Sequence, residues 1–376
     1  MVRILHVLGK LNMGGAESRV MDLYRHIDKS KVQFDFVIHT KEKCYFTDEI
    51  LNMGGNIYSV PRFRIFNYFG YKKAWRELLD EHKGEFKAIQ GHMTSTASIY
   101  LPIAKESGIN TTIAHARSAG VDAGIKGYLT RFLRRNLSKK ADILFTCSSI
   151  AGESVFGKKA VAEGRTQFIP NAIDVPLFKF DASIRDKMLK KYELEDKLII
   201  GHVGRFHYAK NHEYLIKIFR DLLEDWDIEK IKPVLMLIGE GHKRNEIKAL
   251  VIEYGIANSV IFVDNQKNIY DYYQMMDYFL YPSRYEGLPG TVIEAQASGL
   301  RVLMSDTICD EVKITDLVKT KSITDFSDDW AQIILDDVKN NHCTTVNREN
   351  YNDMVIKEGF DINNQSRKME EFYINL

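Results

Sequence analysis

The chain of 376 residues is long enough for two domains of common size. Hydrophobic residues make up 45% and charged residues 27%, as in a soluble globular protein, and the formal net charge of +1 excludes nucleic-acid binding through overall charge. The four cysteines lack Cys-x-x-Cys spacing, which argues against a disulfide framework or a structural zinc site and fits a reducing cytosol. No apolar run approaches the roughly 18 residues of a membrane span, so we expect a cytoplasmic protein.

The first half of the chain alternates short apolar runs with segments of helical pattern. Strands are predicted at residues 4–8, 32–39, 56–60, 88–92, 111–115 and 141–147. Helices are predicted at residues 16–27, 46–52, 75–81 and 98–107. This alternation predicts an α/β domain with a mostly parallel, doubly wound sheet.

Three features of this half are candidates for ligand binding. Gly14 and Gly15 precede a helix whose N-terminus suits a phosphate, although Gly-Gly pairs often only make tight turns. His92 and His115 end two of the strands, where a histidine is either a site residue or a satisfied structural donor.

Two stretches of the first half, 62–73 and 126–140, are basic and apolar together and contain no acid. On a helix, the second stretch would turn its aromatic and leucine side chains toward protein or lipid and surround them with cations. This pattern suits attachment to an anionic bilayer surface. The alternative, which we hold equally open, is an ordinary helix with a solvated basic face.

The second half repeats the alternation. Strands are predicted at residues 198–203, 234–238, 260–263, 278–281 and 300–304. Helices are predicted at residues 212–223, 269–276, 291–299 and 362–376, with another that ends near residue 254. Pro170 and Pro176 interrupt regular secondary structure at the junction between the halves, and we place the domain boundary there.

Two cations stand where a strand of the second half gives way to a helix. Gly204-Arg205 ends the strand, and Lys210 precedes the helix. Arginine and lysine at this position can together neutralise a diphosphate. The alternative is two ordinary surface cations.

The stretch from Tyr281 to Val302 reads YPSRYEGLPGTVIEAQASGLRV, a pattern of strand, loop, helix and strand. In an open α/β sheet, ligands bind at the carboxyl ends of strands, where helix N-termini offer unpaired N–H groups. Gly287 and Gly290 would let the backbone approach an anion, and Glu286 and Glu294 bracket the loop. The structural alternative for Glu294 is a capping box with Thr291 as the N-cap.

This stretch resembles the signature of glycosyltransferase family 4, retaining enzymes of the GT-B fold that include the bacterial exopolysaccharide and capsule enzymes of group 1. The matching elements are Glu286, Gly287-Leu288-Pro289, Glu294 and Ala297-Ser298-Gly299. Further motifs similar to those of the family are Gly14-Gly15-Ala16-Glu17, Pro170-Asn171-Ala172-Ile173-Asp174, Gly204-Arg205 with Lys210, and Gly239-Glu240-Gly241. The sequence departs from the family pattern at Ala116, where aspartate is common, at Ala172, where glycine is usual, and at Asp264-Asn265, where a glycine usually follows the strand.

The resemblance implies a GT-B architecture, in which two Rossmann-like domains face a cleft. Residues 1–170 would form the acceptor-side domain, residues 171–357 the nucleotide-sugar domain, and residues 358–376 a helix that packs back on the first domain. The implied reaction is transfer of a sugar, with retention and without a metal, from a nucleotide-sugar donor to a glycan or glycolipid acceptor in surface polysaccharide synthesis. The expected donor is a UDP-sugar, and no further cofactor is expected.

The resemblance also implies roles for single residues. Arg205 and Lys210 would stabilise the diphosphate leaving group, Glu286 would accept from sugar hydroxyls, and His115 would face the transferred sugar. The other expected substrate-binding residues are Gly14, Gly15, His92, Gly204, Gly239, Glu240, Gly287, Leu288, Pro289, Gly290 and Glu294. A possible further partner is the anionic inner face of the plasma membrane. Two alternatives remain: an epimerase of the same fold, and a non-catalytic subunit that binds a nucleotide sugar.

Overall fold

The structure is a computed structural model that describes residues 1–118, 120, 124–229, 231–340 and 348–376. It divides into two compact units. The first unit contains Met1–Ala172 and Ile362–Leu376, and the second contains Ile173–Asp361. The chain therefore leaves the first unit near the expected boundary at residue 170 and returns to it at Ile362.

The first unit is built on a parallel sheet with the strand order β3-β2-β1-β4-β5-β6-β7. Its strands are β1 (Val2–Val7), β2 (Val32–Ile38), β3 (Ile57–Ser59), β4 (Ala88–Gly91), β5 (Thr111–Ala116), β6 (Ile143–Thr146) and β7 (Thr166–Phe168). Its helices are α1 (Gly15–His26), α2 (Thr47–Asn52), α3 (Tyr68–Glu81), α4 (Thr94–Glu106), α5 (Ile125–Arg134), α6 (Ser149–Phe156), α7 (Lys158–Ala162) and α15 (Ile362–Ile374), with 3₁₀ turns η1 (Ile65–Asn67) and η2 (Leu137–Lys139). Every residue of β2 is buried, as expected for a parallel strand covered by helices on both faces.

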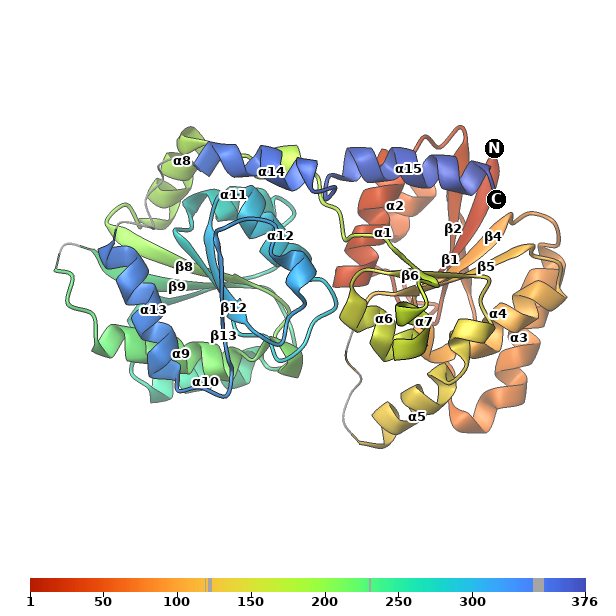
Figure 1. Ribbon diagram of the computed structural model, residues 1–376, viewed down its shortest axis with the longest axis horizontal. Helices are drawn as coiled ribbons and strands as arrows, with labels where there is room; N and C mark the ends of the chain where they lie inside the picture. Colours follow the sequence, from red (N-terminus) through yellow and green to blue (C-terminus); the bar gives the residue numbers. More distant parts are fainter. Residues whose placement is uncertain (119, 121–123, 230, 341–347) are drawn as a thin grey trace. The chain divides into compact units, whose positions relative to one another are not determined.

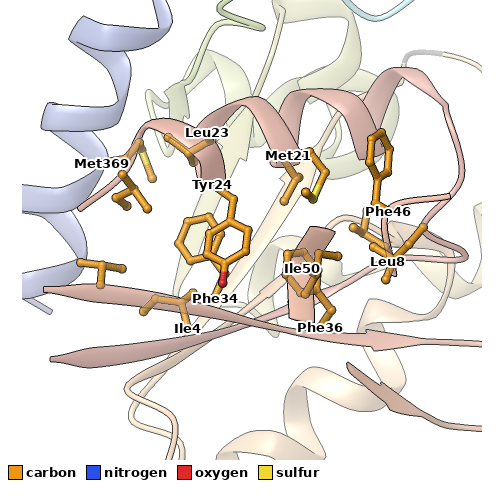
Figure 2. Close-up of a cluster of buried hydrophobic side chains, with 14 of the residues drawn as sticks. Ile4, Leu8, Met21, Leu23, Tyr24, Phe34, Phe36, Phe46, Ile50 and Met369 are labelled. Atoms are coloured by element: carbon orange, nitrogen blue, oxygen red, sulfur yellow. The ribbon is translucent and has the colours of Figure 1, made fainter. Parts of the chain in front are cut away.

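Helix α1 lies on one face of this sheet with α15, and α3 and α4 lie on the other (Figure 1). The core beneath α1 is aromatic: the Tyr24 ring stacks on Phe34, with centroids 5.1 Å apart (Figure 2). Met369 of α15 belongs to the same cluster. Because each such buried side chain contributes about 1.5–3 kcal/mol, the C-terminal helix is an integral part of the first unit.

The second unit repeats the plan with the strand order β10-β9-β8-β11-β12-β13, again parallel. Its strands are β8 (Lys197–Val203), β9 (Lys232–Ile238), β10 (Val260–Val263), β11 (Tyr278–Tyr281), β12 (Arg301–Ser305) and β13 (Val318–Lys321). Its α-helices are α8 (Ala182–Tyr192), α9 (His212–Glu224), α10 (Arg244–Glu253), α11 (Ile269–Met275), α12 (Gly290–Ala297), α13 (Ser327–Lys339) and α14 (Tyr351–Lys357). The 3₁₀ turns are η3 (Val175–Phe178), η4 (Tyr208–Lys210), η5 (Ala257–Ser259), η6 (Asp310–Val312) and η7 (Arg348–Asn350).

The predicted doubly wound α/β class is confirmed, and the strand order locates the point where ligands bind in such sheets. In the second unit the order reverses between β8 and β11, and in the first unit between β1 and β4. Loops that leave these neighbouring strands diverge to opposite faces of the sheet, which opens a crevice at the carboxyl ends.

Two helix predictions were wrong in extent. The basic stretch 126–140 is not one helix, because α5 ends at Arg134 and Asn136 adopts a left-handed conformation with φ 64° before η2 begins. Helix α3 begins at Tyr68, seven residues before the predicted start at Trp75. Its first turn is rich in exposed aromatic side chains, which hide the helical periodicity.

Candidate active site

The carboxyl ends of β8 and β11 carry the predicted charged residues of the second unit. Strand β8 leads through Gly204-Arg205 into η4, which ends at Lys210. Strand β11 leads into the loop that begins at Pro282 and contains Glu286. Since β8 and β11 are paired neighbours, residues predicted from stretches about 80 positions apart meet at the topological switch point.

Lys210 is the centre of this arrangement. Its Nζ lies 2.8 Å from Glu286 Oε1 and also donates to the hydroxyl of Tyr281, the last residue of β11. Both charged side chains retain little solvent contact, 17% for Lys210 and 19% for Glu286. Burial by itself lowers the pKa of Lys210, but the charge of Glu286 and the contact with Tyr281 hold this pKa above its ordinary value. Lys210 is therefore a fixed, permanently charged group.

Gly204 makes room for the stem of Lys210. A Cβ placed at Gly204 would lie 3.2 Å from both Cδ and Cε of Lys210, tighter than most real contacts. The glycine thus lets the lysine stem cross the end of β8 and reach Glu286. Arg205, the next residue, has an exposed side chain beside the same strand end.

The glycines of the Gly239-Glu240-Gly241 turn have a backbone role. Gly239 has φ +147°, and a Cβ there would lie 2.2 Å from the carbonyl oxygen of Gly204. The N–H of Phe206 donates to the carbonyl oxygen of Glu240 at 2.9 Å. These contacts clamp the loop after β9 against the loop after β8, so the turn positions the backbone on either side of Arg205.

The loop before α12 differs from the capping-box alternative. Helix α12 begins at Gly290 with Pro289 as N-cap, so Thr291 lies inside the helix and that alternative is wrong. The turn residues Gly287, Leu288 and Pro289 are buried. The Sγ of Cys309 lies 3.1 Å from the carbonyl oxygen of Gly287, which anchors the turn.

Glu294, on α12, is buried and accepts a hydrogen bond of 2.9 Å from the hydroxyl of Tyr273 on α11. Sequence reasoning missed Tyr273, the partner of Glu294, and Tyr281, the partner of Lys210. Tyr281 ends a predicted strand directly before the signature loop, which was an available signal. Tyr273 gave none, because aromatic residues on a buried helix face usually form core.

The first unit gathers three buried histidines at its own switch point: His6 on β1, His92 after β4 and His115 on β5, hereafter the histidine cluster. His6 Nδ1 lies 3.0 Å from His92 Nε2, and the rings of His92 and His115 have centroids 5.3 Å apart. Arg117 Nε donates to His92 Nδ1 at 3.0 Å, and its Nη1 donates to Asn171 Oδ1 at 2.8 Å.

Burial keeps the histidine cluster neutral. Desolvation, followed by the charge of Arg117, lowers the pKa of His6 to about 3 and holds the pKa values of His92 and His115 well below the ordinary range. His115 is fully buried. Gly14 is the N-cap of α1 and Gly15 its first residue, and a Cβ at Gly15 would meet open space.

The second unit thus brings Gly204, Arg205, Lys210 and Glu286 to the carboxyl edge of its sheet, and the first unit brings His92 and His115 together. Within the described parts of the chain, no group of three or more His, Cys, Asp and Glu side chains is arranged to hold a metal ion. No helix among these residues is long and apolar enough to cross a membrane.

Family models match both units. Residues 13–176 match the model described as glycosyltransferase family 4, and residues 184–370 match the one described as glycosyl transferases group 1. The putative glycosyltransferase EpsF of Bacillus subtilis is 34% identical over 337 residues, which cover 88% of this chain and 86% of that protein. The capsular polysaccharide biosynthesis glycosyltransferase CapH of Staphylococcus aureus is 21% identical over 100% of this chain and 99% of its own.

Solved structures with the same fold include Anabaena HepE in complex with UDP and glucose. Its TM-score is 0.80 with 16% sequence identity, and the match covers 100% of both chains. WaaG, a glycosyltransferase involved in lipopolysaccharide biosynthesis, matches with a TM-score of 0.73 and 14% identity over 98% of this chain and 99% of its own. The GT-B fold predicted from sequence is confirmed, and the chain belongs to the family 4, group 1 glycosyltransferases.

Proposed function

We propose that this glycosyltransferase moves a sugar from a UDP-sugar, with retention of configuration, to a glycan or lipid-linked acceptor in surface polysaccharide synthesis. The names of several relatives support the acceptor class. CapH acts in capsular polysaccharide biosynthesis, and a Campylobacter jejuni relative, 28% identical over 47% of this chain, is named for a diphospho-undecaprenol acceptor. HepE, which shares the fold, was crystallised with UDP.

The observation that carries the proposal is the fixed Lys210 beside Glu286 at the switch point of the second unit. In the transfer, the bond between the anomeric carbon and the diphosphate oxygen breaks while the acceptor oxygen bonds to the same carbon. The acceptor's proton leaves to the departing diphosphate, which collects negative charge. Arg205 and Lys210 would stabilise that charge, the contribution that is usually largest in such reactions.

We also propose that the reaction needs no metal ion, because two cations and the N-terminus of α12 supply positive charge at this edge. Same-face attack would give retention without a carboxylate nucleophile, so Glu286 would orient the donor through its sugar hydroxyls. His92 and His115 would contribute from the first unit.

A thermal-shift screen of nucleotide sugars and free UDP tests the donor, because a ligand that binds only the folded state raises the unfolding midpoint. The donor found there is then incubated with and without candidate acceptors, and the anomeric configuration of the product is read by NMR. Retention in a new glycosidic bond supports the proposal. Conversion of the donor in the absence of acceptor would favour an epimerase, and binding without turnover a non-catalytic subunit.

We further propose that the first unit attaches peripherally to the anionic inner face of the membrane. Two exposed aromatic groups follow strands of the same parallel sheet: Phe66 and Phe69, 82% and 84% exposed, come after β3, and Phe132, 62% exposed, lies on α5 after β5. Exposed Arg131 and Arg135 flank Phe132. Exposed aromatic side chains among cations are the composition of an interfacial anchor, to which each cation adds about 1 kcal/mol.

Co-sedimentation measures this attachment with phosphatidylglycerol-containing vesicles and with pure phosphatidylcholine vesicles, at low and high salt. The double variant Arg131→Glu, Arg135→Glu should release the protein from anionic vesicles. A matched control changes two exposed lysines of α8 in the second unit, Lys187→Glu and Lys190→Glu, and should bind as the wild type does. The attachment is contradicted if the protein does not bind anionic vesicles at low salt. It is also contradicted if binding is unchanged by salt and by both charge reversals.

A further inference from the structure

The C-terminal helix reaches the histidine cluster through a single hydrogen-bond chain. Tyr373 of α15 is fully buried, and its hydroxyl lies 2.6 Å from Oε1 of Gln90 on β4. Nε2 of Gln90 lies 3.0 Å from Nδ1 of His115. The chain therefore runs from the last helix of the protein through β4 to the histidine that ends β5.

The chemistry of the three groups gives this chain a direction. A buried tyrosine hydroxyl has one proton and must donate it, and the amide oxygen of Gln90 is the acceptor beside it. The amide NH₂ of Gln90 is thereby turned toward His115, so Nδ1 of His115 has to accept. A neutral imidazole carries one proton, which must then sit on Nε2.

The result is a donor without an acceptor. Nε2 of His115 is buried and has no partner in the described structure. Leaving an N–H group unsatisfied in the interior costs about 1–3 kcal/mol. An oxygen atom of a ligand at the carboxyl end of β5 would satisfy it.

We infer that Tyr373 and Gln90 are positioning residues of the transferase, which fix His115 as the tautomer that donates from Nε2 to a sugar or phosphate oxygen. The inference deepens the proposed function and rests on it. It gives the C-terminal helix a task beyond packing, since α15 supplies the proton donor that orders the chain. It also explains why a glutamine rather than an apolar residue lies inside the sheet at position 90.

Histidine labelled with ¹⁵N in the ring tests the tautomer independently of activity. The two-bond ¹H–¹⁵N spectrum separates the protonated from the bare nitrogen, and His115→Asn identifies the signals of His115. We expect the proton on Nε2 in the wild type. In Gln90→Glu, an ionised carboxylate accepts at both oxygens, so the proton should move to Nδ1. A wild-type proton on Nδ1 would overturn the inference.

Kinetics test the positioning role, with a second Gln and Tyr pair in the same unit as matched control. Gln33 on β2 is likewise buried and donates to the hydroxyl of Tyr24, away from His115. We expect Gln90→Glu to lower kcat by about tenfold or more with little change in KM for the nucleotide sugar, and Tyr373→Phe by a smaller factor. Gln33→Glu and Tyr24→Phe should lower the unfolding midpoint similarly but leave kcat within about twofold.

The outcomes separate the two ideas. A reversed tautomer in Gln90→Glu with unchanged kcat would show that the hydrogen-bond chain is structural only and would sink the positioning role. If Gln90→Glu does not fold, Tyr373→Phe, which removes one hydroxyl, decides by the same two readouts. Wild-type protein that has the expected tautomer but transfers no sugar from any nucleotide sugar would refute the proposed function and leave the tautomer assignment standing.

Discussion

Replacing Lys210 by methionine separates its charge from its packing. Methionine keeps an apolar stem over Gly204 but removes the ammonium that faces Glu286 and Tyr281. If Lys210 stabilises the leaving diphosphate, turnover should fall by about 10²–10³-fold, the size seen when one preorganised charge-stabilising group is lost.

The effect on stability should be much smaller. Breaking a fully buried ion pair costs roughly 3–5 kcal/mol, because the remaining charge is stranded. Glu286 keeps 19% of its side-chain surface, so water takes over part of the interaction and we expect a loss of about 1–2 kcal/mol. The double variant Lys210→Met, Glu286→Gln removes both charges and should recover most of this stability without recovering turnover.

Urea unfolding measures the loss of stability, and UDP release during transfer measures the loss of turnover. Lys243→Met serves as control, because Lys243 also forms ion pairs, with the more exposed Glu213 and Glu246, but lies outside the proposed site. Turnover within about threefold of wild type in folded Lys210→Met would refute the assignment of charge stabilisation to Lys210.

Four further outcomes are expected. Transfer should persist in excess EDTA, and a full loss restored by magnesium or manganese would show that a metal carries the charge. Gly239→Ala should lower the free energy of unfolding by about 2–4 kcal/mol, because its Cβ would lie 2.2 Å from the Gly204 carbonyl oxygen; an unchanged urea midpoint would contradict the backbone clamp. Tyr273→Phe strips a hydrogen bond from Glu294 and should weaken UDP binding about fivefold by calorimetry if Glu294 holds the ribose, whereas unchanged affinity would remove that role. The histidine cluster binds fewer protons in the folded than in the unfolded state, so its contribution to the free energy of unfolding is present above about pH 6.5 and falls as the pH drops toward the folded pKa. In urea titrations we expect a loss of about 1 kcal/mol per histidine at pH 5.5. A free energy of unfolding that stays constant between about pH 7 and 5.5 would contradict the burial argument.

The sequence was sufficient for the fold because its signals are local. Apolar runs of strand length, such as the one ending at Val203, alternate with helical patterns, and that alternation predicts a parallel sheet. Segments with short or polar elements were not predicted, among them β7 (Thr166–Phe168) and β13 (Val318–Lys321), whose pattern is half exposed. Edge strands have little apolar periodicity to detect, because one side faces no neighbour.

Only those site residues that belong to sequence motifs could be predicted. Lys210 and Glu286 were singled out from separate stretches, but their pairing needs the register of β8 against β11, which no local pattern contains. The hydrogen bond from Tyr373 to Gln90 joins positions 283 residues apart. Contacts of this range arise from topology, so residues such as Tyr273, Gln90 and Tyr373 have no motif that marks them.

The valence of Lys210 leaves one N–H donor for the proposed role of the ion pair. An ammonium group has three N–H donors, and the hydroxyl of Tyr281 and the Oε1 of Glu286 use two of them. The third has no further protein acceptor among the described residues and would remain for a phosphate oxygen while the pair stays intact. The Oε2 of Glu286 is then available for a sugar hydroxyl while Oε1 stays on Lys210. One rigid pair would thus hold the diphosphate and the sugar at a fixed separation, which is what stabilising charge between them requires.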